Sequence, residues 1–197
     1  MSYKIIAISR QFGSAGRTIG RTVSEKLNIP CYDQELIEIF AEQSGFSKEH
    51  IAEIDEHSVK RKLFAPPAER ASNSSILQMS LWNIQEKVIR SLAEKGPCVI
   101  VGRCADYILK DSADCLRVNM HADELFRAER IVKVYGERDE EPINRIRDKD
   151  KRRKEYYQRY TNQKWGDAEN FHIALDSGVF GVDSCVDILA KLYSENR

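Results

Sequence analysis

The sequence predicts an α/β fold: a parallel sheet of about five strands with helices on both faces. Short apolar or β-branched runs alternate along the chain with longer segments whose apolar residues recur at helical spacing. The run 98–101, Cys-Val-Ile-Val, is apolar at every position, as a strand buried on both faces should be. The first such run, 5–8, leads through a loop with two glycines into a helical pattern.

Size and composition favour a single packed domain over residues 1–197. Of the 197 residues, 42% are hydrophobic and 31% are charged, so a core can form and disorder is not expected. Lysine plus arginine equal aspartate plus glutamate at 31 each, so the overall charge favours no class of partner. The chain shows no internal repeat and no low-complexity tract.

Membrane and secretory features are not found in the sequence. No apolar run approaches the ~20 residues of a membrane span, and the first apolar run is too short for a signal peptide. The five cysteines are scattered and form no C-x-x-C, which argues against a disulfide framework or a zinc site. We therefore expect a cytoplasmic protein with no membrane partner, whose cysteines lie mostly in the core.

The loop after the first strand has nearly the spacing of a phosphate-binding loop. Such loops follow G-x-x-x-x-G-K-[ST], and their backbone N–H groups act with the positive end of the next helix to bind the anion. Laid on 11–18, the sequence keeps Gly16 and Thr18 but has Gln11 for the first glycine and Arg17 for the lysine. An ordinary glycine-rich turn between strand and helix is the alternative interpretation.

Each group of this loop has a physical role if it binds phosphate. Gly16 lets the backbone approach the anion closely, and Gly13 can supply a turn with positive φ. Thr18 offers a hydroxyl to Mg²⁺ in the first helical turn. Arg17 keeps a cation, but its planar fork differs from a compact ammonium in how it can follow a migrating phosphoryl group.

The next segment places a carboxylate at the edge of the sheet. A helix is predicted over 18–27 and a short strand at 31–32, so that Asp33 stands at the strand's carboxyl end. Open parallel sheets bind ligands at that edge, so Asp33 is a candidate contact for Mg²⁺, for its water or for an acceptor. Asp33 is also a good N-cap for a helix predicted over 34–43, and the two roles are compatible.

Residues 45–80 look like an excursion between two core helices. A new helix start is predicted at 47, and Pro66-Pro67 with the polar cluster 72–75 marks a loop or hinge. A helix follows over about 76–94, where apolar residues recur in register. An excursion of this kind can close over a ligand or can be a plain surface loop.

Two further strands end in polar residues. The strand 98–101 runs into Gly102-Arg103, where the arginine either aims at an anion beside the loop or lies on the surface. The strand 115–120 is followed by His121, which we interpret as a structural hydrogen-bonding group rather than a base.

The remaining elements complete the alternation. A helix is predicted over 123–135, with Leu125, Ile131 and Val132 facing inward. A final strand is predicted within 170–175 and a capped helix over 183–192.

Between these elements lies the most basic segment of the chain. Residues 145–159 hold eight basic residues against three acidic ones, a net charge of +5. Such a run can be a solvated helix face, a surface that binds nucleic acid phosphates, or a lid that closes on transferring phosphates. Its tyrosines give the helix an apolar side.

Taken in order, these segments resemble the cytidylate kinase-like branch of the nucleoside monophosphate kinases. The segments that carry the resemblance cover nearly the whole chain: 5–18, Tyr32-Asp33, 99–103, 125–128, 150–153 and 171–177. Each string is common by itself, and their order is the stronger indication.

The resemblance implies a fold, an activity and partners. The family has a P-loop NTPase-type core, a helical acceptor-binding excursion and a basic lid, and it transfers the γ-phosphoryl group of ATP to CMP or dCMP with Mg²⁺. On this chain the core would be 1–44, 81–138 and 168–197, the excursion about 45–80 and the lid about 139–167. The partners would be small-molecule nucleotides rather than nucleic acid.

The resemblance also implies roles for individual residues. The ATP phosphates would be held by Gly13, Ser14, Ala15, Gly16, Arg17 and Thr18. Asp33, Arg103, Asp150 and Arg153 would bind the acceptor. Arg17, Arg153 and Arg147 would be the catalytic cations, and Thr18 and Asp33 would face Mg²⁺. No nucleophilic side chain or base is needed, because phosphoryl transfer rests on positioning and charge neutralisation and the attacking phosphate is already ionised.

The chain departs from the family at four places. Gln11 and Arg17 replace a glycine and a lysine, Cys104 follows Gly102-Arg103 where the family has aspartate, and His121 stands where an aspartate is common. Two other functions therefore stay open: a P-loop kinase of another small metabolite, and a non-catalytic protein that binds nucleotides or nucleic acid.

Overall fold

Five parallel strands form one sheet in the computed structural model, which describes residues 3–33, 36, 39, 42 and 73–195. The strands are β1 (Ile5–Arg10), β2 (Cys31–Tyr32), β3 (Cys98–Val101), β4 (Cys115–His121) and β5 (Ile173–Asp176). Their order in the sheet is β2-β3-β1-β4-β5, with β1 pairing with both β3 and β4. The loop after β1 therefore leaves the centre of the sheet, next to the ends of both neighbours.

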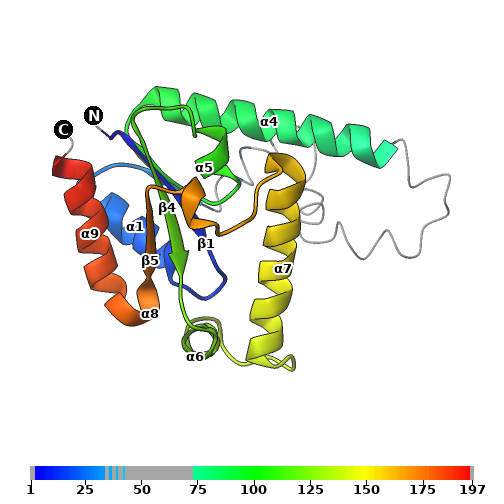
Figure 1. The fold of residues 1–197 in the computed structure, drawn as a ribbon, viewed down its shortest axis with the longest axis vertical. Coiled ribbons are helices and arrows are strands. Elements are labelled where there is room, and N and C mark those ends of the chain that lie inside the picture. The colour runs from blue at the N-terminus through cyan, green and yellow to red at the C-terminus, as the bar shows by residue number, and fades with distance from the viewer. Residues whose placement is uncertain (1–2, 34–35, 37–38, 40–41, 43–72, 196–197) are drawn as a thin grey trace.

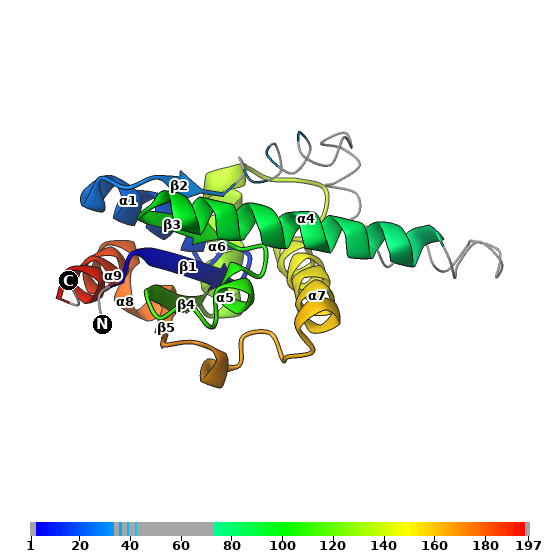
Figure 2. The same cartoon turned by 90° about the horizontal axis from the view of Figure 1, so that it is seen from above.

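Helices cover both faces of the sheet, as Figure 2 shows. α1 (Gly16–Leu27) and α9 (Val182–Glu195) lie on one face, and α4 (Asn73–Lys95) and the short α5 (Ala105–Ile108) lie on the other. α6 (Glu124–Tyr135) follows the carboxyl end of β4 and packs against α7 (Pro142–Thr161), which stands beside the sheet (Figure 1). Two short helices, η2 (Ala168–Asn170) and α8 (Ser177–Phe180), flank β5.

The alternation of side chains along β1 divides the core into two layers. Ile6 and Ile8 pack with buried residues of α1 and α9, among them Ile19 and Leu189. Ile5 and Ala7 point the other way, into a cluster that includes buried residues of α4 and α5. Four of the five cysteines are buried: Cys98, Cys104, Cys115 and Cys185. Both faces of the central strand are therefore apolar, which is why the run reads as continuously hydrophobic.

The predicted fold class is confirmed, with differences in detail. α1 begins at Gly16, two residues before the predicted start, and α4 begins at Asn73, inside the predicted polar loop 72–75. β5 begins at Ile173 because Asn170 closes η2, and α5, η2 and α8 were not predicted. Leu125 is 63% exposed, so its predicted inward orientation is wrong, whereas Ile131 is fully buried.

Some predictions cannot be compared with the structure. The helices predicted at 34–43 and from 47 lie outside the described residues, apart from positions 36, 39 and 42. The limits of the excursion and the lid stay predictions. No helix in the described part of the chain is long and apolar enough to cross a membrane.

Candidate active site

The loop between β1 and α1 is tied to the end of β4. The backbone N–H of Gln11 donates to the Met120 carbonyl at 3.0 Å, and the Gln11 side-chain oxygen accepts from the Ala122 N–H at 3.1 Å. The buried Ser14 hydroxyl bonds the carbonyls of Gln11 and Met120, at 2.9 and 3.1 Å. The glutamine that replaces the first glycine of the motif thus anchors the loop. In this structure the Ser14 hydroxyl stabilises the conformation of the loop rather than binding a ligand.

Both glycines of the loop are required by close packing. Gly13 has φ +84°, and a Cβ there would lie 2.9 Å from the Arg127 carbonyl oxygen. A Cβ on Gly16 would lie 2.6 Å from the Arg10 Cβ. The predicted positive φ of Gly13 is confirmed, and the group that crowds Gly16 in this structure is a neighbouring side chain.

The start of α1 has the geometry of an anion site. Ala15 is left-handed, with φ 58°, and within the described residues no side chain caps the helix there. The N–H groups of a first helical turn have no partner inside the helix and carry its positive end. Thr18 lies in this turn, and its hydroxyl accepts a hydrogen bond from Arg130 Nη2 at 2.9 Å.

A second anchor reaches the loop from α7. Asp150 accepts from the Phe12 N–H at 2.7 Å through one oxygen and pairs with Arg127 through the other. Arg127 also donates to the Phe12 carbonyl at 3.1 Å. The Phe12 ring stacks on Tyr135, with ring centroids 5.9 Å apart. Asp150, predicted to bind the acceptor, is thus used in this structure to hold the loop.

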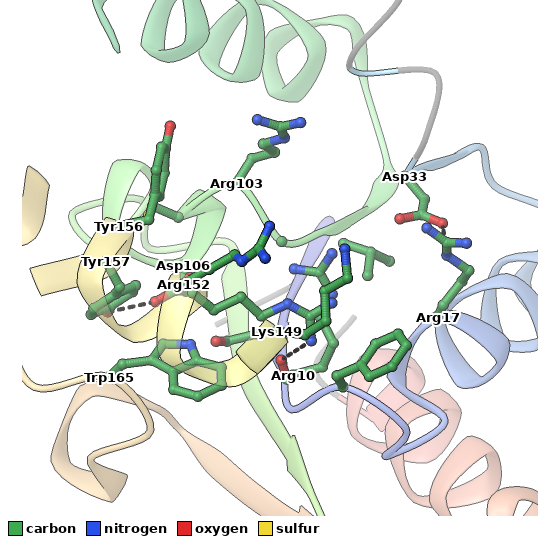
Figure 3. A pocket seen from close by; sticks show the side chains of 16 residues that line it. Arg10, Arg17, Asp33, Arg103, Asp106, Lys149, Arg152, Tyr156, Tyr157 and Trp165 are labelled. Atoms are coloured by element: carbon green, nitrogen blue, oxygen red, sulfur yellow. Dashed lines mark hydrogen bonds and ion pairs between the residues drawn. The ribbon is translucent and has the colours of Figure 1, made fainter. Parts of the chain in front are cut away.

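Two adjoining cavities open at this edge of the sheet. The first, of about 300 Å³, is shown in Figure 3. Six cationic side chains line it: Arg10, Arg17, Arg103, Lys149, Arg152 and Arg153. Two carboxylates, Asp33 and Asp106, line it as well. Positive charge therefore dominates this cavity.

The second cavity, of about 260 Å³, contains the loop. Its walls include Gln11, Phe12, Gly13, Ala15, Gly16, Arg17 and Thr18. Arg130, Arg138 and Arg145 add positive charge, opposed by Glu140 and Asp148. Five residues line both cavities: Arg10, Phe12, Arg17, Lys149 and Arg153. Groups bound in the two cavities would therefore share four cations: Arg10, Arg17, Lys149 and Arg153.

Arg10, at the end of β1, is a site residue that the sequence reasoning missed. Burial, together with the nearby Arg153, lowers the pKa of its guanidinium to about 9, although Asp33 opposes the shift. The guanidinium lies against Gly102, where a Cβ would come within 1.9 Å of Arg10 Nη1. Arg153 donates to the Arg10 carbonyl at 3.1 Å. An incoming anion would stabilise the charge of this half-buried arginine, which lies among other cations.

Arg17 and Asp33, which both line the first cavity, form an ion pair at one side of it (Figure 3). Asp33 is only 6% exposed, and its carboxylate meets the Arg17 Nε. The pair joins the end of β2 to the first turn of α1. The two predicted metal-facing residues thus line different cavities, Thr18 the second and Asp33 the first.

Another wall of the first cavity contains Arg103 and the buried Asp106. Gly102, Arg103 and Cys104 have φ of 85°, 55° and 53°, so the chain turns sharply after β3. Asp106 follows on α5, and burial raises its pKa to about 6. Its carboxylate accepts from the Tyr157 hydroxyl at 2.7 Å, and burial together with this acid raises the pKa of Tyr157.

The basic run on α7 is not one solvated face. Lys149, Arg152 and Arg153 line the first cavity, and Arg145 lines the second. The exposed Arg147, predicted to be catalytic, lines neither: it makes a two-point ion pair with Glu124, at 2.7 and 2.8 Å. His121 Nδ1 lies 3.7 Å from a carboxylate oxygen of Asp176, and its structural hydrogen-bonding role stays a prediction.

The residues that were missed differ in how much the sequence indicated them. Arg10 stands at the carboxyl end of a buried strand, the same position that marked Arg103, so that rule could have found it. Lys149 and Arg152 belong to the basic run but could not be ranked within it. Asp106 and Trp165 carry no pattern that points to a site.

The fold, together with the phosphate-type loop after the central strand, places this protein in the class with a P-loop kinase fold. The chain belongs to the cytidylate kinase-like family, whose family profile matches residues 5–179. A search of curated proteins finds no match.

Solved structures agree with this assignment of the fold. An uncharacterized protein from Eubacterium ventriosum ATCC 27560 is 28% identical, with a TM-score of 0.71 and coverage of 96% of this chain and 98% of that one. Shikimate kinase from Acinetobacter baumannii, in complex with shikimate, is 14% identical, with a TM-score of 0.57 and coverage of 99% and 95%. A gluconokinase from Sinorhizobium meliloti 1021 is 14% identical, with a TM-score of 0.54 and coverage of 99% and 97%. Fold and family together support a phosphotransferase that uses a nucleotide.

Proposed function

We propose that this protein transfers the γ-phosphoryl group of ATP to a nucleoside monophosphate, with CMP and dCMP as the acceptors to test first. One observation carries the proposal: two cavities meet at the phosphate-type loop and share Arg10, Arg17, Lys149 and Arg153. A donor in one cavity and an acceptor in the other would bring their phosphates together between those cations. Such placement supplies both the positioning and the charge neutralisation that phosphoryl transfer needs.

The second cavity fits the triphosphate of the donor. It combines the uncapped start of α1 with Arg17 and five further arginines. Thr18 lines this cavity in the first helical turn, and its hydroxyl, which accepts from Arg130 Nη2, would exchange that partner for Mg²⁺. Asp33, the second proposed metal residue, is paired with Arg17. When bound, Mg²⁺ would offset charge on the phosphate oxygens.

Among the described residues, no group of three His, Cys, Asp or Glu side chains could hold a metal ion. A metal held mainly by substrate phosphates and water, with one or two protein oxygens, needs no such group.

The first cavity fits the acceptor. At about 300 Å³ it is at the small end of ligand pockets, roughly 300–1,000 Å³. Arg103 and Arg153 would bind the monophosphate, which agrees with the roles implied by the family resemblance. Aromatic side chains, Tyr156 and Trp165, line the same cavity and offer apolar surface to a base or sugar. An acceptor-binding excursion at about 45–80 and a lid at about 139–167 are part of this proposal.

The attacking phosphate is already ionised, so no residue has to remove a proton. Arg17 and Arg153 are the proposed catalytic cations. Lys149 and Arg10 also line both cavities, and we assign them the same catalytic role as Arg17 and Arg153. Arg147 is paired with Glu124, outside both cavities. The catalytic role proposed for Arg147 therefore rests on the family resemblance alone.

A second candidate is a kinase whose acceptor is a hydroxyl group. A hydroxyl has to lose a proton during transfer, and a carboxylate in reach can accept it. The observation in favour is that Asp33 and Asp106 both line the first cavity. Nucleic-acid binding is less well supported, because much of the basic run faces the cavities or forms ion pairs.

An acceptor screen tests these functions. The protein is incubated with Mg²⁺, ATP carrying a labelled γ-phosphate, and a panel of nucleoside monophosphates, small polyols and hydroxy acids. Label on CMP or dCMP supports the proposal, and label only on a hydroxyl compound supports the second candidate. No transfer to any acceptor, together with salt-sensitive RNA or DNA binding, would overturn both. The Arg17→Ala variant, purified in parallel, measures the background from contaminating kinases.

A further inference from the structure

The corner after β3 is an unusual piece of backbone. Arg103 and Cys104 are consecutive non-glycine residues in the left-handed region, directly after a left-handed Gly102. This conformation is disfavoured for any residue with a Cβ, so neighbouring groups must hold it in place. Because Arg103 lines the first cavity, the support of this corner bears on where its guanidinium points.

One buried side chain on α4 supplies such support. Gln85 is only 3% exposed, and its Nε2 donates to the Arg103 carbonyl at 2.9 Å. Its other amide atom, Oε1, accepts from the Tyr156 hydroxyl on α7 at 2.8 Å. Gln85 therefore connects two of the segments that contribute cations to the first cavity, the corner after β3 and α7, although it does not itself line either cavity.

The α7 end of this connection is held by aromatic packing. The Tyr160 ring stacks on Trp82 of α4, with centroids 4.7 Å apart and planes 4° from parallel. Tyr156 packs against Tyr160 at the same centroid distance. Tyr156 lies three residues after Arg153, so holding Tyr156 also fixes the turn of α7 that presents Arg152 and Arg153 to the cavity.

We propose that Gln85 is a positioning residue for the acceptor cavity. It holds the left-handed Arg103 corner and, through Tyr156, keeps that corner in a fixed place relative to the cations of α7. The inference rests on the proposed function, because it assigns the first cavity to the acceptor. The direct contacts of Gln85 are on the acceptor side: its two hydrogen bonds reach Arg103 and Tyr156, and both line the first cavity and not the second.

Steady-state kinetics of four variants test this role. Gln85→Met keeps the length and the apolar bulk of the side chain but removes both hydrogen bonds. Tyr156→Phe removes only the hydrogen bond between Gln85 and α7. The variant with both substitutions completes a double-mutant cycle. Glu86→Gln is the matched control: it is the next residue on α4, and its carboxylate pairs with Arg90 at the surface.

We expect Gln85→Met to lower kcat/KM for the acceptor by about tenfold or more, since small misplacements of binding groups are costly, and to change KM for ATP much less, because the direct contacts of Gln85 line only the first cavity. The double variant should be no worse than Gln85→Met, because Tyr156 would act through Gln85. Equal losses for ATP and acceptor, or single effects that simply multiply, would show a general structural role and would overturn the proposal.

A measurement that needs no turnover separates this proposal from the proposed function. Amide hydrogen exchange at 102–106 should be faster in Gln85→Met than in wild type or Glu86→Gln. Faster exchange without acceptor turnover in the wild-type protein would refute the proposed function and keep the Gln85 link. Unchanged exchange together with unchanged acceptor kinetics would refute the link itself.

Discussion

The contact between Arg10 and Gly102 leads to a sharp test of the acceptor cavity. In Gly102→Ala, the new Cβ would lie 1.9 Å from Arg10 Nη1 and 2.5 Å from Cζ, so the guanidinium must move. The backbone φ of +85° adds the cost of a left-handed residue with a side chain, about 1–2 kcal/mol of folding free energy. Because Arg10 lines both cavities, its displaced side chain would enter the space that we assign to the reacting phosphates.

Gly181 offers a control for replacing a positive-φ glycine away from the site. It has φ +77°, a Cβ there would meet nothing within 4 Å, and it follows α8, away from both cavities. Gly181→Ala should lose about 1–3 kcal/mol of folding free energy, because φ 77° with ψ 164° is a conformation almost reserved for glycine, and should keep its kinetics. Gly102→Ala should also lose stability and, in addition, about a hundredfold in acceptor kcat/KM.

Urea unfolding measures the first quantity, and acceptor turnover at saturating ATP measures the second. The comparison is made at a temperature where both variants are folded, so that stability does not enter the rates. If Gly102→Ala is folded and turns over acceptor as Gly181→Ala does, then the position of Arg10 does not matter for the acceptor. The assignment of the first cavity would then lose its central cation.

Three further predictions follow from the charged groups. Arg17→Ala should lower kcat by about 10²–10³-fold, the usual loss when one group that stabilises transferring charge is removed, and unchanged ATP affinity and rate would end the assignment of the loop. Arg153→Ala should mainly raise KM or lower kcat for the acceptor, with Arg147→Ala as its comparison on the same helix. Equal effects of the two would show that exposed lid charge, rather than cavity contact, matters. Burial raises the pKa of Asp106 from 3.8 to about 6, so folding takes up a proton between these values. The stability that protonated Asp106 contributes is present below about pH 4 and lost as pH rises through about 6, a change of about 3 kcal/mol. Asp106→Asn keeps an oxygen that can accept from Tyr157, so urea unfolding across this range should show that part of the pH dependence in wild type only.

Local patterns were enough to predict the parallel sheet, the phosphate-type loop and the position of Arg103 after β3. Each rests on residues that are neighbours in sequence: an apolar run, a glycine at a fixed spacing, an arginine after a strand. The errors lie where packing overrules such patterns. Leu125 has the spacing of an inward residue but stays exposed, and the polar residues 73–75 extend α4 because they precede a long amphipathic helix.

The roles within the site could not be ranked from sequence. Asp150 and Arg147 belong to the same basic helix, yet one anchors the Phe12 backbone and the other pairs with Glu124. Asp106 had no motif to mark it, although burial, opposed by the hydrogen bond from Tyr157, gives it the most shifted pKa of any carboxyl with a resolved shift among the described residues.

The sequence by itself determined the class of fold and the presence of a loop suited to phosphate, because both follow from periodicity and spacing along the chain. Only the tertiary structure decided which of the many cations share a cavity. Arg10, Arg17, Lys149 and Arg153 come from β1, α1 and α7, and the order of strands brings these elements to one edge of the sheet. Distances between such residues depend on how helices pack on the sheet, and no short stretch of sequence encodes them.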